Sequence, residues 1–370
     1  MPSKTRQLGL PDARTLIVEC GFGGNGDTPA SPSIGVELES FTVPAWDPAR
    51  LPHPYLPAGS RLSFEPGGQV EISSLPADTV AAACDAVSTD LTAISEAFSH
   101  LGVQLIQRGL SACPPQRLVD GPRYRAMEAY FDSGWPAGRR MMCATAAVQV
   151  NLSLADGRWE AANALGPVLA AGFANSRLPE WANGRLATWL ALDPSRTAPV
   201  GGGAPPSEAW VDYALAARVM FIRVNDGHYV TLDGPLTAGE WVRAGHPLGW
   251  PTADDLAYHL TTLFPPVRPK RWLELRMLDS LPDPWWRVPV AVAAALVDDE
   301  VAVEDASSTA GRWMEAATDG LADPAIGRVA RVVAVRALAG LDRVGADEYT
   351  AQLTEQWADA VLGGRSMPWT

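Results

Sequence analysis

The chain of 370 residues is 47% hydrophobic and 19% charged, and its formal net charge is −13. This composition is typical of a folded protein and excludes extensive disorder. The acidic excess argues against nucleic acids and anionic membranes as main partners. It does not exclude a bound nucleotide, because local basic residues and metal ions can supply the positive field.

Four cysteines lie far apart and form neither a CxxC pair nor a cluster with zinc-binding spacing, which predicts reduced thiols. They are Cys20, Cys84, Cys113 and Cys143. No basic region followed by an apolar run indicates a signal peptide. The longest apolar stretch, residues 288–297, contains a proline and is too short to cross a bilayer. We therefore expect a cytoplasmic protein with no membrane partner.

An irregular lead-in is predicted over residues 1–33, ending in the glycine-rich run 21–27. This run superficially suggests a phosphate-binding loop. However, no Gly-Lys-Ser/Thr follows it and no strand–turn–helix context surrounds it, so a linker is the better interpretation. The rest of the chain, residues 34–370, shows no internal repeat and no clean linker. It is expected to form a single domain whose C-terminal part is helical from about residue 285.

Apolar periodicity predicts the elements of this domain. Residues 79–101 are expected to form a helix, with Asp78 or Thr79 as N-cap and Gly102 just past the end. A strand is expected at 103–108. The proline- and glycine-rich segment 194–206 is expected to be a loop, with a lid as one functional alternative. The other predicted helices begin near residue 123 and span about 159–175, 207–221, 288–297, 310–317, 326–338 and 347–362.

Four strand-like segments each carry two polar residues spaced two apart, with apolar residues between them. The pairs are Glu37/Glu39, Gln69/Glu71, Gln149/Asn151 and Glu274/Arg276. In a strand, residues two apart point to the same side of the sheet. One face would therefore be apolar and the other polar. This predicts an α+β fold, with an antiparallel sheet whose apolar face is packed with helices.

The polar face concentrates carboxylates, which repel one another but are suitable ligands for divalent cations. Glu37, Glu39, Glu71 and Glu274 are therefore candidate Mg²⁺ ligands, and the planar fork of Arg276 suits a phosphate or carboxylate. Without a Walker motif, this predicts ATP binding on an antiparallel sheet. A glycosidase would need two carboxylates but not the amide and guanidinium rows. Solvated acids on an exposed sheet face are the simpler alternative.

Several motifs occur in one order: GVELE at 35–39, EPGGQVE at 65–71, RYRAME at 123–128, TAAVQVNL at 145–152, YAL at 213–215 and HLTTLFPPVRPKRWLELR at 259–276. On these motifs the chain resembles the glutamate–cysteine ligase family of plant and actinobacterial type. Within that family it is most similar to the actinobacterial enzymes of ergothioneine biosynthesis. The resemblance extends from about residue 33 to residue 300.

The resemblance implies a glutamine synthetase-like sheet and a catalytic domain over residues 34–370. It also implies ATP and Mg²⁺ as cofactors, with L-glutamate and L-cysteine as substrates. The product would be γ-glutamylcysteine, made through a γ-glutamyl phosphate. By motif position, the metal ligands are Glu37, Glu39, Glu71 and Glu274; the catalytic residues are Glu71, Arg185 and Arg276; the substrate-binding residues are Arg185, Trp189, Gln149, Asn151 and Tyr213; and the ATP-binding residues are Arg276, Gln69, Arg125 and Lys270.

Three departures from the family pattern bear on these assignments. Ser74 replaces a glycine, Thr145 is followed by two alanines, and segment 176–181 differs from the usual small-residue loop. The last leaves open a ligase with a different amine acceptor. A non-catalytic paralogue that binds nucleotide or glutamate is a further alternative. Tyr213 is equally consistent with a core residue, and Arg123 and Arg125 with pairing to local acids. The sequence leaves the oligomeric state open.

Overall fold

The computed structural model describes residues 7–23, 33–202, 204–225, 228–232 and 234–369. At its centre these residues form a seven-stranded sheet in the order β2-β3-β1-β5-β9-β8, with β4 paired to β1. Every pairing is antiparallel, so the predicted sheet is confirmed. The strands are β1 (Ile34–Val43), β2 (Arg61–Phe64), β3 (Val70–Ser73), β4 (Gln104–Ile106), β5 (Val148–Ser153), β8 (Val267–Pro269) and β9 (Trp272–Leu275).

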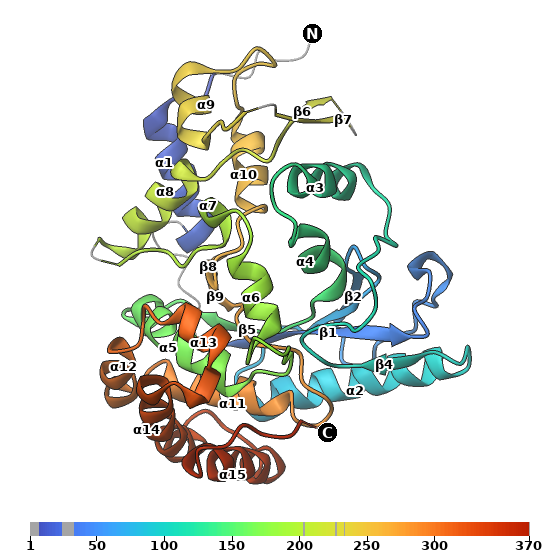
Figure 1. Ribbon diagram of the computed structural model, residues 1–370, viewed down its shortest axis with the longest axis vertical. Helices are drawn as coiled ribbons and strands as arrows, with labels where there is room; N and C mark the ends of the chain where they lie inside the picture. The colour runs from blue at the N-terminus through green and yellow to red at the C-terminus, as the bar shows by residue number, and fades with distance from the viewer. Residues whose placement is uncertain (1–6, 24–32, 203, 226–227, 233, 370) are drawn as a thin grey trace.

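One face of the sheet is apolar and covered by helices, as the alternating sequence pattern predicts. Val36, Leu38, Val150 and Leu273 are completely buried on this face. Helix α2 (Val80–Ser99) packs on β1 and β3, and α11 (Arg287–Leu296) packs on β5. Figure 1 shows α2 and α11 beneath the sheet. The α+β class, with helices packed on the apolar face, is confirmed.

The predicted helix at 79–101 corresponds to α2. Its N-cap is Thr79, whose hydroxyl accepts a hydrogen bond from the backbone N–H of Ala82 at 3.1 Å. Gly102 follows the helix with a φ of +70°, a conformation in which a side chain would be strained. The capping residues and the apolar stripe of α2 could therefore both be recognised from the sequence.

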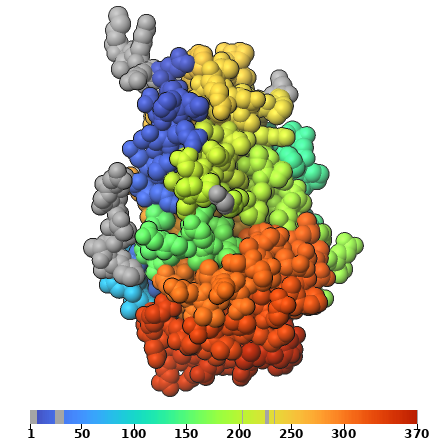
Figure 2. Space-filling model, turned by 90° about the vertical axis from the view of Figure 1, so that its left-hand side faces the viewer, coloured from blue at the N-terminus to red at the C-terminus, as the bar shows by residue number. Residues whose placement is uncertain are grey.

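The C-terminal part of the chain, from residue 287, forms the helical layer below the sheet. Its helices are α11 (Arg287–Leu296), α12 (Glu300–Ser307), α13 (Trp313–Thr318), α14 (Pro324–Gly340) and α15 (Glu348–Leu362), with a 3₁₀ turn at Gly320–Ala322. Helices α12, α13 and α14 pack on α5 (Arg158–Gly172). The predictions for α11, α14 and α15 are confirmed to within two residues, whereas α12 was not predicted. Figure 2 shows this layer filling the lower half of the molecule. None of the helices described is long and apolar enough to cross a membrane.

The predicted irregular lead-in is wrong for residues 10–22, which form helix α1 (Leu10–Phe22). Ala13, Ile17 and Gly21 form its buried face, and a side chain at Gly21 would collide with the indole of Trp210. A stripe made of one alanine, one isoleucine and one glycine carries little hydrophobic signal, which explains the error. The glycine-rich run that follows lies mostly outside the described residues.

Helix α1 belongs to an upper layer with α8 (Pro206–Ala216), α9 (Ala238–Ala244) and α10 (Ala253–Leu260). The helix predicted at 207–221 ends earlier than expected, because Phe221 begins the two-stranded sheet β6 (Phe221–Asn225) and β7 (His228–Thr231). Helices α3 (Pro122–Asp132), α4 (Gly138–Ala144), α6 (Gly184–Leu190) and α7 (Pro194–Thr197) stand above the polar face of the sheet. The predicted loop at 194–206 thus begins with a helical turn.

One buried apolar cluster includes residues from Leu8 to Val361 and therefore connects the upper and lower layers. A short 3₁₀ turn, Pro48–Arg50, follows β1. The division into a lead-in and one catalytic domain stays a prediction, apart from the helix found at 10–22.

Candidate active site

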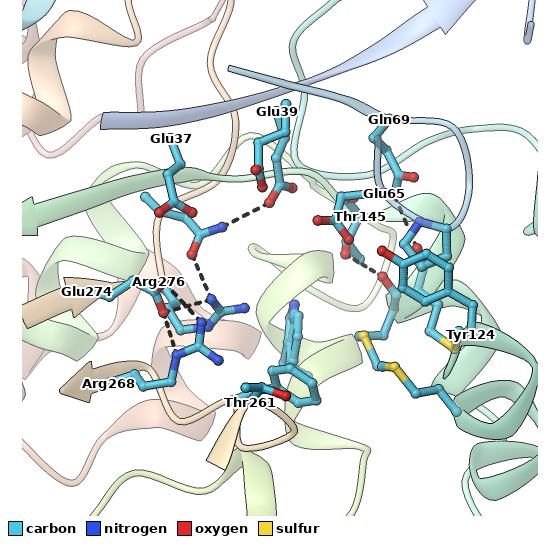
Figure 3. A pocket seen from close by; sticks show the side chains of 18 of the residues that line it. Glu37, Glu39, Glu65, Gln69, Tyr124, Thr145, Thr261, Arg268, Glu274 and Arg276 are labelled. Atoms are coloured by element: carbon cyan, nitrogen blue, oxygen red, sulfur yellow. Dashed lines mark hydrogen bonds and ion pairs between the residues drawn. The ribbon is translucent and has the colours of Figure 1, made fainter. Parts of the chain in front are cut away.

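The polar face of the sheet forms the floor of a cavity of about 260 Å³. Helices α3, α4 and α6 and the segment 261–264 supply its other walls. Of the 13 residues assigned from the sequence, the cavity lining includes these 10: Glu37, Glu39, Gln69, Glu71, Gln149, Arg185, Trp189, Lys270, Glu274 and Arg276. Figure 3 shows several of them converging, with Glu37 and Glu39 facing Arg268, Glu274 and Arg276.

The register of the strands brings the polar pairs together. Glu39 lies opposite Glu71 in the β1–β3 pair, and Glu37 lies opposite Gln149 in the β1–β5 pair. In the β5–β9 pair, Asn151 lies opposite Glu274. Directly opposite residues share a sheet face, so four strands contribute to one polar surface.

Glu39 is a buried carboxyl group surrounded by neutral hydrogen-bond donors. It accepts hydrogen bonds from the backbone N–H of Ala147 at 2.8 Å and from Nε2 of Gln149 at 3.0 Å. Burial, and to a smaller extent the negative charge of the nearby Glu71, raises the pKa of Glu39 to about 7. The carboxylate form of this residue therefore needs additional positive charge.

Glu37 and Glu71 likewise accept hydrogen bonds from neutral donors. Glu37 accepts a hydrogen bond from Nδ2 of Asn151 at 3.1 Å. Burial and the neighbouring carboxylates raise the pKa of Glu37. Glu71 accepts hydrogen bonds from the hydroxyls of Ser63 at 2.7 Å and Ser73 at 3.1 Å. An exposed arginine, Arg61, lies 3.7 Å from the Glu71 carboxylate.

Glu65 is a further acid of this cavity, which sequence reasoning missed. Burial, and to a smaller extent the negative charges of Glu71 and Glu39, raises the pKa of Glu65 to about 8. The β2–β3 turn that follows Glu65 is pressed against α4: a side chain at Gly67 would lie 2.3 Å from the carbonyl oxygen of Cys143. The motif EPGGQVE could have indicated this acid. A tight turn at its two glycines pairs the flanking strands and so places Glu65 and Glu71 on the same face of the sheet.

Glu274 has the opposite environment, because three cations surround its fully buried carboxylate. Arg268 donates to it twice, at 2.6 and 3.0 Å, while Lys270 and Arg276 each donate at 2.9 Å. Burial alone would raise the pKa of Glu274, but the three cations hold it well below its usual range. As it stands, this carboxylate orders the cations. Its predicted metal ligation would require these ion pairs to open.

Gln149 links the acidic and basic sides of the cavity. Its Nε2 donates to Glu39 at 3.0 Å, while its Oε1 accepts a hydrogen bond from Arg276 at 2.7 Å. The two contacts fix the orientation of the amide. The guanidinium of Arg276 is thereby held between Gln149 and Glu274.

Arg185 is 4% exposed and reaches the cavity from α6. Its Nη2 donates to the carbonyl oxygen of Arg276 at 2.9 Å, and its Nη1 lies 3.8 Å from Oδ1 of Asp279. The Nε of Arg185 and the indole Nε1 of Trp189 are buried without a hydrogen-bond partner among the described residues. Two oriented donors are therefore available to an anionic ligand.

Comparison with known proteins gives the family. The model described as glutamate–cysteine ligase family 2 (GCS2) matches residues 33–357. This chain belongs to glutamate–cysteine ligase family 2. The glutamate–cysteine ligase EgtA of Mycolicibacterium smegmatis is 40% identical over 322 residues, covering 78% of this chain and 76% of that enzyme. The family resemblance inferred from the motifs is confirmed.

More distant relatives are found in plants. The chloroplastic glutamate–cysteine ligase of Brassica juncea is 33% identical over 264 residues, covering 65% of this chain and 50% of that enzyme. Among solved structures, a bifunctional glutathione synthetase from Pasteurella multocida matches with a TM-score of 0.48 and 15% identity. That match covers 97% of this chain and 49% of the other.

The ligase family implies bound Mg²⁺, and the donors present suit it. Glu37, Glu39, Glu65 and Glu71 offer carboxylate oxygens, and the Oε1 of Gln69 is buried without a hydrogen-bond partner in the described part of the chain. No three His, Cys, Asp or Glu side chains of the described residues are close enough to hold a metal ion as they stand. Metal binding would therefore draw these acids closer together. This is consistent with the raised pKa values of Glu37, Glu39 and Glu65, to which neighbouring carboxylates contribute.

Tyr213 was assigned to the substrate site but does not line the cavity. It lies on α8, where its ring stacks on Trp210 with centroids 5.7 Å apart. Its hydroxyl is buried without a partner among the described residues, and burial raises its pKa. Helix α8 packs on α1 in the upper layer, so Tyr213 lies outside the cavity.

Replacing Tyr213 with Phe should leave turnover unchanged. The variant should be as stable as the wild type or more stable by about 1 kcal/mol, because an unpaired buried hydroxyl is removed. Steady-state kinetics and denaturant unfolding would test this expectation. A large rise in the KM for either amino acid would return Tyr213 to the substrate site.

Arg125 and Asn151 also lie outside this cavity. Arg125 is exposed and pairs with Asp120, whereas Arg123 lines the cavity and donates to the hydroxyl of Thr261 at 2.9 Å. Asn151 lines an adjoining cavity. The sequence assigned Arg125 to the ATP-binding residues and left Arg123 unassigned, whereas the structure places Arg123 on the cavity and Arg125 outside it.

The raised pKa values predict how stability depends on pH. The folded protein keeps protons on Glu39 and Glu65 up to about pH 7 and 8, whereas an ordinary carboxyl group loses its proton near 4.5. Stability without metal should therefore fall as the pH rises toward 8. Buried His259, with a pKa lowered to about 4, contributes the opposite slope below its ordinary value of 6.5. The fall should accordingly be clearest above pH 6.5.

Thermal unfolding in EDTA between pH 6.5 and 8 would measure this slope. A Glu65→Gln variant should lose part of it, because one late-titrating group is removed. A wild-type midpoint that rises over this interval would contradict the assigned proton linkage.

Proposed function

We propose that this protein is an ATP- and Mg²⁺-dependent ligase. It joins the γ-carboxylate of L-glutamate to the amino group of L-cysteine, and the γ-glutamylcysteine feeds ergothioneine biosynthesis. One observation carries this function: a single cavity places Glu37, Glu39 and Glu71, with neutral hydrogen-bond donors, opposite cations grouped around Glu274. The names of the relatives, glutamate–cysteine ligases, support the choice of substrates.

The two sides of the cavity would divide the chemistry. Glu37, Glu39, Glu65 and Glu71 would hold magnesium, which neutralises phosphate oxygens. The γ-carboxylate of glutamate would displace ADP from the γ-phosphate of ATP, and the cysteine amine would then displace phosphate from the acyl carbon. Arg276, held in place by Gln149 and Glu274, would stabilise charge on the phosphoryl group during both steps.

Substrate positioning would come from the wall opposite the sheet. Arg185 carries an unpartnered Nε and lies beside Trp189, with its guanidinium 6.0 Å from the ring centroid, so it suits a carboxylate of glutamate. Met127, Met141 and Met142 form a buried sulfur-rich part of the wall. Such soft, polarizable side chains fit the small thiol side chain of cysteine. We place the reaction in the cytoplasm, where ATP and reduced thiols are available.

A coupled assay tests the proposal. ADP release should require Mg²⁺, ATP and glutamate and should rise when cysteine is added, and mass spectrometry should identify γ-glutamylcysteine. A panel of other amines, including serine and α-aminobutyrate, would establish the acceptor. Preference for another amine would keep the ligase chemistry but replace the substrate. Nucleotide binding without any product would instead indicate a non-catalytic paralogue.

A further inference from the structure

A second cavity of about 540 Å³ adjoins the first where β1 begins. The two share Glu37, Arg61 and Lys270 in their linings, so they are neighbours along the same sheet face. The first cavity, at about 260 Å³, is smaller than the roughly 300–1,000 Å³ of typical ligand pockets. It is therefore too small for ATP together with two amino acids. The second cavity supplies the missing space.

The second cavity has a bare floor between two apolar walls. Gly35 lies two residues before Glu37 on the same face of β1, opposite Asn151, and contributes no side chain to the floor. Trp272 at the start of β9 forms one wall, and Leu75 after β3 belongs to the other. These two side chains are 37% and 60% exposed, which is high for large apolar groups.

The indole of Trp272 is held in a defined orientation. Its Nε1 donates to Oδ1 of Asn151 at 2.9 Å, and Nδ2 of that amide donates to Glu37 at 3.1 Å. The ammonium of Lys270 lies 5.2 Å from the centroid of the indole ring. An exposed aromatic ring with a fixed orientation is suited to stacking with a flat ligand.

The charge of the second cavity distinguishes between ligands. Its charged residues, Glu37, Arg61 and Lys270, are those it shares with the first cavity. The rest of the lining is neutral: serines, glycines, Asn151 and apolar side chains. The neutral part of the lining, beyond the three shared charged residues, suits an uncharged base and a ribose, whereas charged ligand groups would lie toward the first cavity.

We propose that the second cavity binds the nucleoside of ATP. The purine base stacks on Trp272, and the triphosphate passes Lys270 and Glu37 into the first cavity. This inference depends on the proposed use of ATP. It assigns Asn151 the role of orienting the indole that contacts the base.

Calorimetric titrations with MgATP and with magnesium plus inorganic triphosphate distinguish the contribution of the nucleoside to binding from that of the phosphates. Trp272→Ala should weaken MgATP binding about ten-fold, as expected for the loss of one base–aromatic stack. Binding of inorganic triphosphate should stay unchanged, because it has no base. Trp272→Phe should restore most of the affinity. Trp250→Ala removes another exposed indole, 45% exposed and absent from both linings, and should bind MgATP like the wild type.

Two results would overturn the assignment: unchanged MgATP affinity in Trp272→Ala, or an equal loss for MgATP and inorganic triphosphate. The second would mean that Trp272 acts through Glu37 and the phosphate region rather than through the base. If the wild type binds neither compound, the proposed function itself fails. The wild-type titrations therefore distinguish failure of the enzyme proposal from failure of the nucleoside site.

Discussion

Replacing Glu71 with Gln should lower MgATP-dependent turnover by at least about 10²-fold, the usual cost of losing one electrostatic contact to a developing charge. The fold should persist, because glutamine can still accept the hydrogen bonds from Ser63 and Ser73. In EDTA at pH 8 the variant should unfold at the same temperature as the wild type or higher. The substitution removes one negative charge beside Glu39 and Glu65, so it relieves repulsion.

Magnesium provides a second readout for the same variant. Added Mg²⁺ should stabilise the wild type more than Glu71→Gln, because a ligand that binds the folded state raises its stability. Glu355→Gln, at an exposed position on α15, is a matched control that should behave like the wild type in both assays. Full turnover in Glu71→Gln would remove this residue from the metal ligands.

Replacing Arg276 with Lys should reduce kcat by roughly 10²–10³-fold even though the positive charge is kept. Nη1 of the guanidinium donates both to Oε1 of Gln149 at 2.7 Å and to Glu274 at 2.9 Å, and these contacts hold the planar group in one orientation. A lysine ammonium is a flexible point charge and cannot reproduce that geometry. The amide of Gln149 would then lose its fixed orientation toward Glu39.

Arg125→Lys is the comparison for this experiment. Arg125 belongs to the same predicted ATP-binding set but lies outside the cavity, paired with Asp120. Its substitution should leave kcat and the KM for ATP close to those of the wild type. Equal losses in the Arg125 and Arg276 variants would mean that the cavity does not delimit the nucleotide site.

Much of the site could be predicted because strands have a period of two. Glu37 and Glu39 share a face wherever β1 is placed, and so do Glu274 and Arg276 once their segment is a strand. Apolar residues between them bury the opposite face. The same reasoning failed for α1, whose buried face of Ala13, Ile17 and Gly21 is too weakly hydrophobic to be seen in the sequence.

Other features depended on contacts between distant segments. Arg123 and Arg125 are two residues apart on α3, so they point about 200° apart around the helix. Which of them faces the cavity depends on how α3 packs above the sheet. Tyr213 likewise lies outside the cavity because α8 packs on α1 in the upper layer. The local sequence pattern does not indicate which of these side chains lines the cavity.

The sequence by itself determined that four acids lie on the polar side of their strands, and its motifs identified the family. Only the tertiary structure decided which charges meet. Pairing of β1 with β3 places Glu39 beside Glu71 without a strong counter-charge, while the β8–β9 hairpin places Arg268 against Glu274. The physical reason is that electrostatic energy depends on distance and burial. Both are determined by strand order and helix packing, which join segments far apart in the chain.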